Sequence, residues 1–445
     1  MTRDSVFSLG PDGGREVPCG LPGSRAPAPR RPNKICETDE PPGCRSVSGK
    51  AAAGHVSYAP AISGINHKTI DMQVFGYGAT KAKRDLEPVV FERTDPRAGE
   101  IGFKVIFCGV CHSDLHQVND DWDNSVYPCV PGHEIVGRVT TVGAGVTKFK
   151  EGDLIGVGCM VNSCQTCEEC RNDMEQYCTG PKGATLTYNG PTKPDGSNTY
   201  GGYTSHMVVR EEFAITIPDA IEPQYAGPIM CAGVTTFSPM RRWNLQKGQT
   251  LGVAGIGGLG HMAVQLGKAL GAKVIAFTGH ESKRQAILDL GADEVVVTSD
   301  KDAMVDHAQS LDLMINTIPY PFELQPFITL MKKNSSLVMV GNFIKIPEFV
   351  PADVIFNRIE VAGSLIGGIK DTQDVVNLCA EHGIRPHIKL IDIEEVNDVF
   401  TALKKDKADH EFRHVIDMES LHRRTGELDG KAERIDAPKR GEVVR

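Results

Sequence analysis

Four closely spaced cysteines form a pattern that is typical of a metal site. They follow the spacing C-x2-C-x2-C-x7-C and are Cys164, Cys167, Cys170 and Cys178. Four thiolates suit the tetrahedral coordination of zinc, and such a closed site stabilises a loop that has little apolar core of its own. Four thiolates also hold iron–sulfur clusters, which is the alternative interpretation. We predict a structural zinc site in this loop.

A second set of possible metal ligands is dispersed along the chain. The set consists of Cys111 in CGVCHSDLH, His133 and Glu134 in VPGHEIVG, and Cys231 in MCAGVTT. Three ligands of mixed sulfur and nitrogen type leave zinc a fourth position for water or substrate, which is the pattern of a catalytic site. Spacing alone leaves another interpretation open, because a buried cysteine often serves only as a small packing residue.

A glycine-rich turn indicates a nucleotide-binding site. The run GIGGLG has the spacing G-x-G-x-x-G, follows the strand-like TLGVA and precedes a helix-forming stretch. The first glycine permits the tight turn, the second lets backbone amides approach a pyrophosphate, and the third lets the helix pack on the strand. We therefore predict a dinucleotide site, for which a plain tight turn is the alternative. The residues of this turn are Gly255, Gly257, Gly258, Leu259 and Gly260.

The residue that ends the next predicted strand distinguishes NAD from NADP. In NAD-binding folds an Asp or Glu about 20 residues further on binds the ribose 2′-hydroxyl. Here the strand KVIAF is followed by Thr278, and the cations Lys283 and Arg284 come shortly after. A pocket with no acid and two cations favours the 2′-phosphate of NADP. The alternative is an ordinary basic first turn of a solvated helix, which Glu281 would also suit.

Two architectures are needed to position these residues. Before residue 250 the apolar runs are short and β-branched, as at 101–107 and 135–142, which is typical of an all-β region. After residue 250, short apolar strands alternate with helical stretches, which predicts a parallel, doubly wound sheet. Beyond residue 369 a helix, the strand HIKLI and a second helix close the folded part. The predicted class is α/β, with a β-rich part and a part built on a parallel, doubly wound sheet.

Composition and charge exclude several classes of protein. Of the 445 residues, 40% are hydrophobic and 24% are charged, which is the balance of a folded globular chain. The formal net charge of −9 opposes binding to nucleic acids or anionic membranes. No apolar run reaches the length of about 20 residues that spans a bilayer, and residues 1–30 lack the apolar core of a signal peptide, so we expect a cytoplasmic protein. We expect residues 1–66 to be a disordered extension and residues 419–445 to be a charged, solvated tail.

The motifs together resemble those of the zinc-dependent medium-chain alcohol dehydrogenases. The resemblance is carried by CGVCHSD, GHE, the four-cysteine loop and GIGGLG. The longer runs YPCVPGHEIVG, CAGVTTFSP and GSLIGGIKDTQ are most similar to the cinnamyl alcohol dehydrogenase branch. The resemblance covers about residues 74–417. It implies a GroES-like catalytic domain at 67–232 and 369–418, and an NADP-binding Rossmann domain at 233–368.

The resemblance gives each residue of the dispersed set a role. Cys111, His133 and Cys231 would be the catalytic zinc ligands. Glu134 would coordinate the zinc when substrate and water are absent. Asp114 would accept the remaining ring N–H of His133 and thereby fix its tautomer.

The resemblance also implies residues that contact substrate and cofactor. Ser113 and His116 would form a proton relay, in which Ser113 holds the substrate hydroxyl and its proton passes through the cofactor ribose toward His116. His112 would lie near the cofactor phosphates, and Thr235 would lie against the nicotinamide ring. Trp122 is the candidate for the wall of the substrate pocket.

The activity implied is hydride transfer between NADP(H) and an aromatic or medium-chain aldehyde/primary alcohol pair, with two zinc ions per chain. Thr278 and Lys283 align with the family's 2′-phosphate-binding residues, whereas Gly279 and His280 depart from the hydroxyl residues often found there. Aldehyde reduction is the expected direction, and a homodimer is expected from the family. The alternatives are a polyol or secondary-alcohol dehydrogenase of the same superfamily and a non-catalytic NADP-binding sensor.

Overall fold

The computed structural model describes residues 72–188, 199–341, 345, 347–404 and 413–435. The predicted disorder of residues 1–66 concerns a part of the chain outside these ranges. Within them, no helix is both long enough and apolar enough to cross a membrane.

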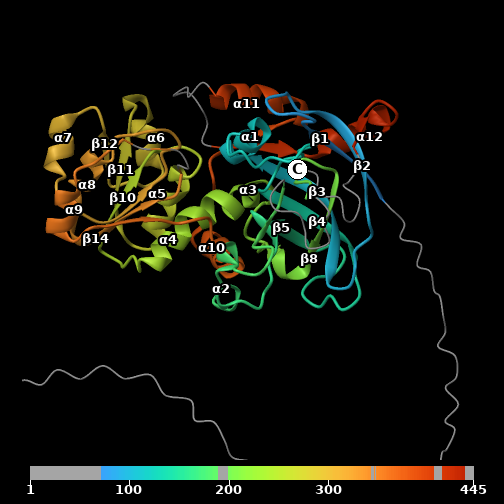
Figure 1. Cartoon of the computed structure of the whole chain (residues 1–445), viewed down its shortest axis with the longest axis horizontal. Helices are drawn as coiled ribbons and strands as arrows, with labels where there is room; N and C mark the ends of the chain where they lie inside the picture. Colours follow the sequence, from blue (N-terminus) through green and yellow to red (C-terminus); the bar gives the residue numbers. More distant parts are fainter. Residues whose placement is uncertain (1–71, 189–198, 342–344, 346, 405–412, 436–445) are drawn as a thin grey trace, which may run out of the picture. The chain divides into compact units, whose positions relative to one another are not determined.

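The residues before 220 form a mainly antiparallel β structure, as predicted. Its largest sheet has the strand order β16-β17-β3-β4-β5-β9, and β8 also pairs with β3 (Figure 1). The strands are β3 (Glu100–Val110), β4 (Ile135–Val142), β5 (Leu154–Val157), β8 (His206–Arg210), β9 (Ile215–Thr216), β16 (Ile388–Ile391) and β17 (Arg413–Asp417). The predicted strands at 101–107 and 135–142 are confirmed. Because β16 and β17 come from late in the chain, this sheet is built from two distant segments.

Two smaller sheets complete the β-rich part within the described residues. One has the order β1-β2-β18, and the other pairs β6 with β7. Their bounds are β1 (Met72–Gly78), β2 (Glu87–Arg93), β18 (Glu433–Arg434), β6 (Met160–Asn162) and β7 (Thr185–Leu186).

The residues after 250 form one parallel sheet with the order β12-β11-β10-β13-β14-β15. The strands are β10 (Thr250–Ala254), β11 (Lys273–Thr278), β12 (Glu294–Val297), β13 (Leu311–Asn316), β14 (Met331–Met339) and β15 (Glu360–Gly363). Helices α5 (Gly260–Ala269) and α6 (Arg284–Asp289) pack into the core on one face, and α7 (Lys301–Asp306) and α8 (Gln325–Ile328) pack into a second core on the other (Figure 1). The doubly wound architecture is confirmed. The carboxyl ends of β10 and β11 meet at one edge, where such sheets bind nucleotides.

A continuous helical run precedes the parallel sheet. It consists of α3 (Pro223–Pro228), a π-helical turn (Ile229–Gly233) and α4 (Val234–Arg242). Single π-turns are frequent at functional sites, and this one contains Cys231. The other helices are α1 (His112–Asn119), α2 (Glu168–Arg171), α9 (Pro351–Asn357), α10 (Ile369–His382), α11 (Val396–Lys404) and α12 (Glu419–Leu428).

The C-terminal residues up to 435 are ordered, so the prediction of a solvated tail is wrong for 419–435. Helix α12 occupies Glu419–Leu428, and β18 pairs in parallel with β2. Leu421, Leu428 and Ile435 are buried in the core of the β-rich part. The many charges concealed these positions, because an amphipathic helix needs only a few apolar residues on one face. Residues 436–445 lie outside the described residues.

Candidate active site and metal centres

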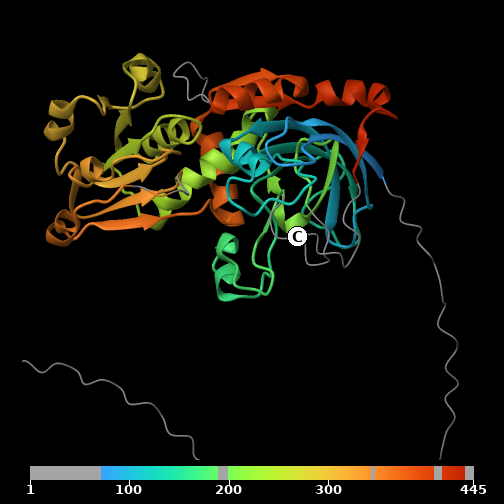
Figure 2. The same cartoon turned by 45° about the horizontal axis from the view of Figure 1, so that its top comes forward.

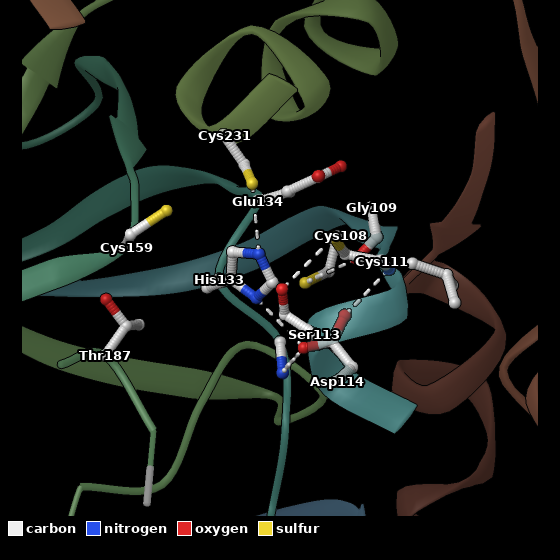
Figure 3. Close-up of polar contacts among 12 residues, drawn as sticks. Cys108, Gly109, Cys111, Ser113, Asp114, His133, Glu134, Cys159, Thr187 and Cys231 are labelled. Carbon is white, nitrogen blue, oxygen red and sulfur yellow. Dashed lines mark hydrogen bonds and ion pairs between the residues drawn. The ribbon is translucent and has the colours of Figure 1, made fainter. Parts of the chain in front are cut away.

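Separate elements bring the dispersed metal-ligand residues together (Figure 3). Cys111 directly precedes α1, His133 and Glu134 directly precede β4, and Cys231 lies in the π-helical turn. The ligand atoms of these four residues lie within 4.8 Å of one another, and all four residues are buried. Two sulfurs, an imidazole nitrogen and a carboxylate in one small volume fit the coordination preferences of zinc.

Asp114 fixes the orientation of the metal-site histidine. Its Oδ1 accepts hydrogen bonds from Nδ1 of His133 and from the N–H of Gly132, both at 3.0 Å. Its Oδ2 accepts a hydrogen bond from the N–H of Cys111 at 2.8 Å. Because the carboxylate accepts a hydrogen bond from Nδ1–H, the lone pair of Nε2 of His133 is available to a metal, and Nε2 lies 3.3 Å from the sulfur of Cys231. The family resemblance implied this hydrogen bond between Asp114 and His133.

The buried cysteines of this site differ in their tendency to ionise, and hydrogen bonds with Cys111 and Cys159 raise the pKa of Cys231 well above its usual value. The pKa of Cys111 lies well below its usual value because the thiol of Cys231 hydrogen-bonds to it, and the charge of Arg413 contributes. A hydrogen bond with Cys231 also lowers the pKa of Cys159, which lies between β5 and β6 and was not among the predicted residues. Zinc binds thiolates rather than thiols, so these interactions favour metal binding at Cys111, whereas the raised pKa of Cys231 opposes its ionisation.

Glu134 faces a buried arginine that no sequence pattern indicated. Nη2 of Arg413 lies 3.3 Å from Oε1 of Glu134, and both side chains are buried. Burial raises the pKa of Glu134 to about 7, against the lowering effect of Arg413. Arg413 begins β17, and its Nη1 donates to the carbonyl of Val110 at 3.2 Å. An arginine in an ordinary strand has no spacing signal, so only the pairing of β17 with β3 reveals its position.

The predicted proton-relay residues lie on α1. The sulfur of Cys111 is 3.7 Å from the hydroxyl oxygen of Ser113. Nδ1 of His116 lies 2.8 Å from Oδ2 of Asp121, and the side chain of His116 is 34% exposed. The ring centroids of His116 and Trp122 are 5.5 Å apart. A partly exposed histidine with a carboxylate partner is suited to exchanging protons with solvent, and Asp121 is the partner that the sequence analysis missed.

The four predicted cysteines converge in a projecting lobe, residues 164–178, which we call the cysteine lobe (Figure 2). Their four sulfur atoms lie within 4.8 Å of one another. The backbone N–H groups of Thr166 and Cys167 donate to the sulfur of Cys164 at 3.4 and 3.3 Å. Hydrogen bonds from the backbone and hydroxyl of Thr166 lower the pKa of Cys164 to about 5. Four sulfur ligands in this arrangement fit a closed tetrahedral zinc site.

The glycine-rich turn has the geometry that a nucleotide loop requires. Gly255 has a φ of 84°, which residues with a side chain rarely adopt. A Cβ at Gly260 would collide with the carbonyl oxygen of Gly255, whereas a Cβ at Gly257 would meet no atom within 4 Å. A Cβ at Gly258 would lie 2.8 Å from the guanidinium carbon of Arg413. Arg413 therefore lies against the turn as well as beside the metal group.

The residues predicted to bind the 2′-phosphate differ in their placement. Thr278 is buried at the end of β11. Nζ of Lys283 lies 3.5 Å from the carbonyl oxygen of Ile256, which places its charge against the glycine-rich turn. Arg284 instead forms an ion pair with Glu281 at 2.6 Å. The structure thus places Lys283, but not Arg284, against the turn.

His112 and Thr235 directly adjoin the metal-binding segments. His112 is the first residue of α1, and burial lowers its pKa. Thr235 is buried near the start of α4, four residues after Cys231. Their contacts with a cofactor stay predictions.

Comparison with known proteins identifies the relatives of the chain. Residues 97–219 match the alcohol dehydrogenase GroES-like domain, and residues 258–381 match zinc-binding dehydrogenases. An aldehyde reductase of Escherichia coli is 44% identical over 354 residues, which cover 79% of this chain and 99% of that relative.

Two solved structures extend this comparison. A cinnamyl alcohol dehydrogenase of Sorghum bicolor is 38% identical and superposes with a TM-score of 0.74. The alignment covers 78% of this chain and 98% of the Sorghum bicolor chain. A cinnamyl alcohol dehydrogenase of Helicobacter pylori, solved with NADP(H), is 36% identical and superposes with a TM-score of 0.73. The alignment covers 79% of this chain and 99% of the Helicobacter pylori chain.

Proposed function

The chain belongs to the zinc-binding alcohol dehydrogenase family, with a GroES-like domain and a Rossmann domain, and we propose that it interconverts an aldehyde and a primary alcohol with NADP(H). The observation that carries this proposal is the buried group of Cys111, His133 and Cys231 with the hydroxyl of Ser113 beside it. A non-catalytic sensor would need neither these metal ligands nor the partly exposed His116 on the adjoining helix.

The chain's own residues would orient the substrate and move one proton. Zinc held by the buried group would act as a Lewis acid toward the substrate oxygen. Asp114 binds the Nδ1 side of His133 and so leaves Nε2 available as a zinc ligand. In aldehyde reduction the hydroxyl of Ser113 would hold the substrate oxygen and deliver a proton to it, and the partly exposed His116, which contacts Asp121, would resupply that proton from solvent. The bound nicotinamide would supply the hydride, and the task of the chain would be to hold it beside the substrate carbon.

We propose NADP as the cofactor and two zinc ions per chain. Because β11 ends in Thr278 rather than an acid, and Lys283 supplies a positive charge, the site favours a 2′-phosphate. Arg413 lies against Gly258 and would bind the pyrophosphate. The Helicobacter pylori relative solved with NADP(H) supports this choice. The second zinc would be structural and would occupy the cysteine lobe.

We propose an aromatic or medium-chain aldehyde as the substrate. The side chains packed around Cys159 are mainly apolar, among them Met160, Met230 and Ile366, and they enclose a cavity of about 10 Å³, which has room for about one water molecule and not for an aldehyde. Apolar surroundings of the metal group would favour such a substrate over a polyol, whose hydroxyl groups would lose their hydrogen bonds with water. The relatives named as an aldehyde reductase and as cinnamyl alcohol dehydrogenases support the same class. Because cellular NADPH is kept largely reduced, we propose reduction as the main direction.

The assembly is proposed to be a homodimer that joins coenzyme domains edge to edge. Strand β15 lies at the edge of the parallel sheet, and the neighbouring α9 exposes Ile355 and Phe356, whose relative exposures are 72% and 82%. Unpaired strand edges and exposed apolar side chains are both features of association surfaces.

The domain boundaries at 67–232 with 369–418, and at 233–368, also stay proposals, as does the cytoplasmic location.

The proposed function is tested by initial-rate reduction of cinnamaldehyde, benzaldehyde, a short aliphatic aldehyde and fructose. Each is measured with NADPH and with NADH on protein of known zinc content. We expect fast NADPH-dependent turnover of the apolar aldehydes. Preferential reduction of fructose would favour the polyol alternative, and no turnover of any substrate at full zinc occupancy would contradict the proposed activity.

A further inference from the structure

We propose that Tyr188 is a positioning residue for the metal-site histidine, and that its ring keeps the imidazole of His133 in the orientation that a metal requires. This inference rests on the proposed function, because His133 needs a fixed orientation only if it binds a metal. Tyr188 lies two residues after β7 and was not among the residues that the sequence indicated.

The rings of Tyr188 and His133 pack against each other. Their centroids are 5.2 Å apart, and their planes are inclined by 33°. Two rings that are this close to parallel overlap with their faces at such a separation, because contact between their edges would hold the centroids farther apart. The relative exposures are 7% for Tyr188 and 3% for His133, so both rings are shielded from solvent. Such aromatic pairs stabilise each other beyond the apolar area that they bury.

This face contact restricts a motion that the other contacts of the imidazole leave free. Nδ1 of His133 donates to Oδ1 of Asp114 at 3.0 Å, and Nε2 lies 3.3 Å from the sulfur of Cys231. These two contacts act on the two ring nitrogens and define an axis through them. The ring can still rock about that axis, which changes the direction of the Nε2 lone pair. A second ring packed against its face opposes this rocking.

The backbone of His133 is already held, so the tilt of the ring is the freedom that remains. The N–H of Gly132 donates to Oδ1 of Asp114 at 3.0 Å. On the other side, the carbonyl oxygen of Glu134 accepts a hydrogen bond from the N–H of Gly109 at 2.9 Å. Both neighbours of His133 are therefore fixed by hydrogen bonds to separate segments.

Tyr188 can support another ring because its own segment is firmly attached. The N–H of Thr187 donates to the carbonyl oxygen of Cys159 at 3.1 Å (Figure 3). The hydroxyl of Thr187 donates to the carbonyl oxygen of Gly158 at 2.5 Å, and its residue is 1% exposed. The preceding strand β7 pairs with β6. The backbone that carries Tyr188 is thus part of a hydrogen-bonded β structure beside the metal group.

The test compares three substitutions of Tyr188 with one control. Tyr188→Phe keeps the ring, whereas Tyr188→Leu and Tyr188→Met remove it. Methionine retains more of the side-chain length and adapts to irregular space, so Tyr188→Met decides the test where Tyr188→Leu does not fold. Tyr200→Leu is the control, because Tyr200 is 3% exposed and its ring packs on Phe91, with centroids 4.7 Å apart. The control removes a buried aromatic pair that contains no proposed metal ligand.

The measurements separate metal binding from turnover. We would determine zinc affinity by competition with a chromophoric chelator, the visible spectrum after Co²⁺ replaces zinc, the melting temperature, and kcat and KM for the aldehyde. The Cys111→Ser variant identifies which zinc and which Co²⁺ bands belong to the buried group. Because the absorption of Co²⁺ depends on the geometry of its ligands, its spectrum reports the orientation of His133 without any turnover.

We expect Tyr188→Leu and Tyr188→Met to bind the zinc of the buried group about two- to tenfold more weakly, which is the range that one aromatic contact predicts. Their Co²⁺ spectra should shift, and the zinc of the cysteine lobe should stay bound. Tyr188→Phe should keep the wild-type zinc affinity and spectrum. Tyr200→Leu should lower only the melting temperature.

Wild-type zinc affinity and Co²⁺ spectra in the two variants without the ring would overturn the proposal. A change in KM for the aldehyde alone would also overturn it, because Tyr188 would then act on the substrate. Equal losses of zinc affinity in Tyr188→Phe or Tyr200→Leu would do the same, since they would indicate a role of the hydroxyl or general destabilisation.

Failure of the proposed function gives a different result. A wild-type protein that binds both metal ions and reduces no aldehyde would refute the proposed activity, and zinc affinity and Co²⁺ spectra would still decide the role of Tyr188. A wild-type protein that binds no metal at the buried group would refute both the proposed activity and the role of Tyr188.

Discussion

Substitution of Asp114 by asparagine should weaken zinc binding at the catalytic site without changing the zinc ligands themselves. Asp114 is fully buried and accepts hydrogen bonds from His133, Gly132 and Cys111. The hydroxyl of Tyr203 is a further donor, 3.3 Å from Oδ2. One carboxylate therefore holds one metal ligand by its ring and another by its backbone.

The size of the effect follows from this geometry. An asparagine has only one acceptor oxygen. If that oxygen keeps the hydrogen bonds from His133 and Gly132, the NH2 group of the asparagine faces the N–H of Cys111 and the hydroxyl of Tyr203. A buried N–H donor that has no acceptor costs about 1–3 kcal/mol of free energy. Substitution of the hydrogen-bonding partners of metal ligands typically lowers metal affinity about 10–100-fold. We expect Asp114→Asn to fall within that range and to lose activity at limiting zinc.

The assay is competition for zinc against a chromophoric chelator, with Asp121→Asn as the matched control. Asp121 is a partly exposed carboxylate that pairs with His116 and not with a proposed ligand. Asp121→Asn should keep wild-type zinc affinity and lose turnover. Wild-type zinc affinity in Asp114→Asn would refute the proposed role of Asp114 in orienting His133.

Three further predictions concern the cofactor site and the C-terminus. Arg413→Met should weaken NADPH binding by about tenfold in fluorescence titration, since a charge-assisted contact with the pyrophosphate is lost; unchanged binding would exclude that contact. Lys283→Glu should reverse the cofactor preference, because it places a negative charge where a 2′-phosphate would bind, and the ratio of kcat/KM for NADPH and NADH measures this; a retained preference for NADPH would remove Lys283 from the site. Truncation after Met418 should lower the free energy of unfolding by about 3–6 kcal/mol, because the truncated α12 buries Leu421 and Leu428. Urea unfolding checks this value, and an unchanged midpoint would mean that α12 contributes no stability.

The sequence was most informative where chemistry depends on residues that are close along the chain. The four cysteines of the lobe span fifteen positions, from 164 to 178, and the glycine turn lies directly between a strand and a helix. Their spacing alone therefore predicts both the residues and the local structure. The dispersed group of Cys111, His133 and Cys231 needed the family resemblance, because no periodicity connects segments that are so far apart.

The residues that the sequence did not indicate depend on long-range pairing. Arg413 reaches Glu134 only because β17 returns to pair with β3, and the register that sets His414 opposite Val110 has no local signature. The contact between the rings of Tyr188 and His133 has the same origin. The C-terminal helix was missed for another reason. Its charged residues outnumber the few leucines that determine its packing.

The most direct test of the division into catalytic and structural metal sites is zinc analysis with turnover on two matched variants. The account predicts two zinc ions per chain and NADPH-dependent aldehyde reduction in the wild-type protein. Cys111→Ser should retain one zinc and its thermal stability but lose turnover, whereas Cys164→Ser should lose the other zinc and mainly lose stability. Full turnover in a Cys111→Ser variant that has lost one zinc would contradict the central claim.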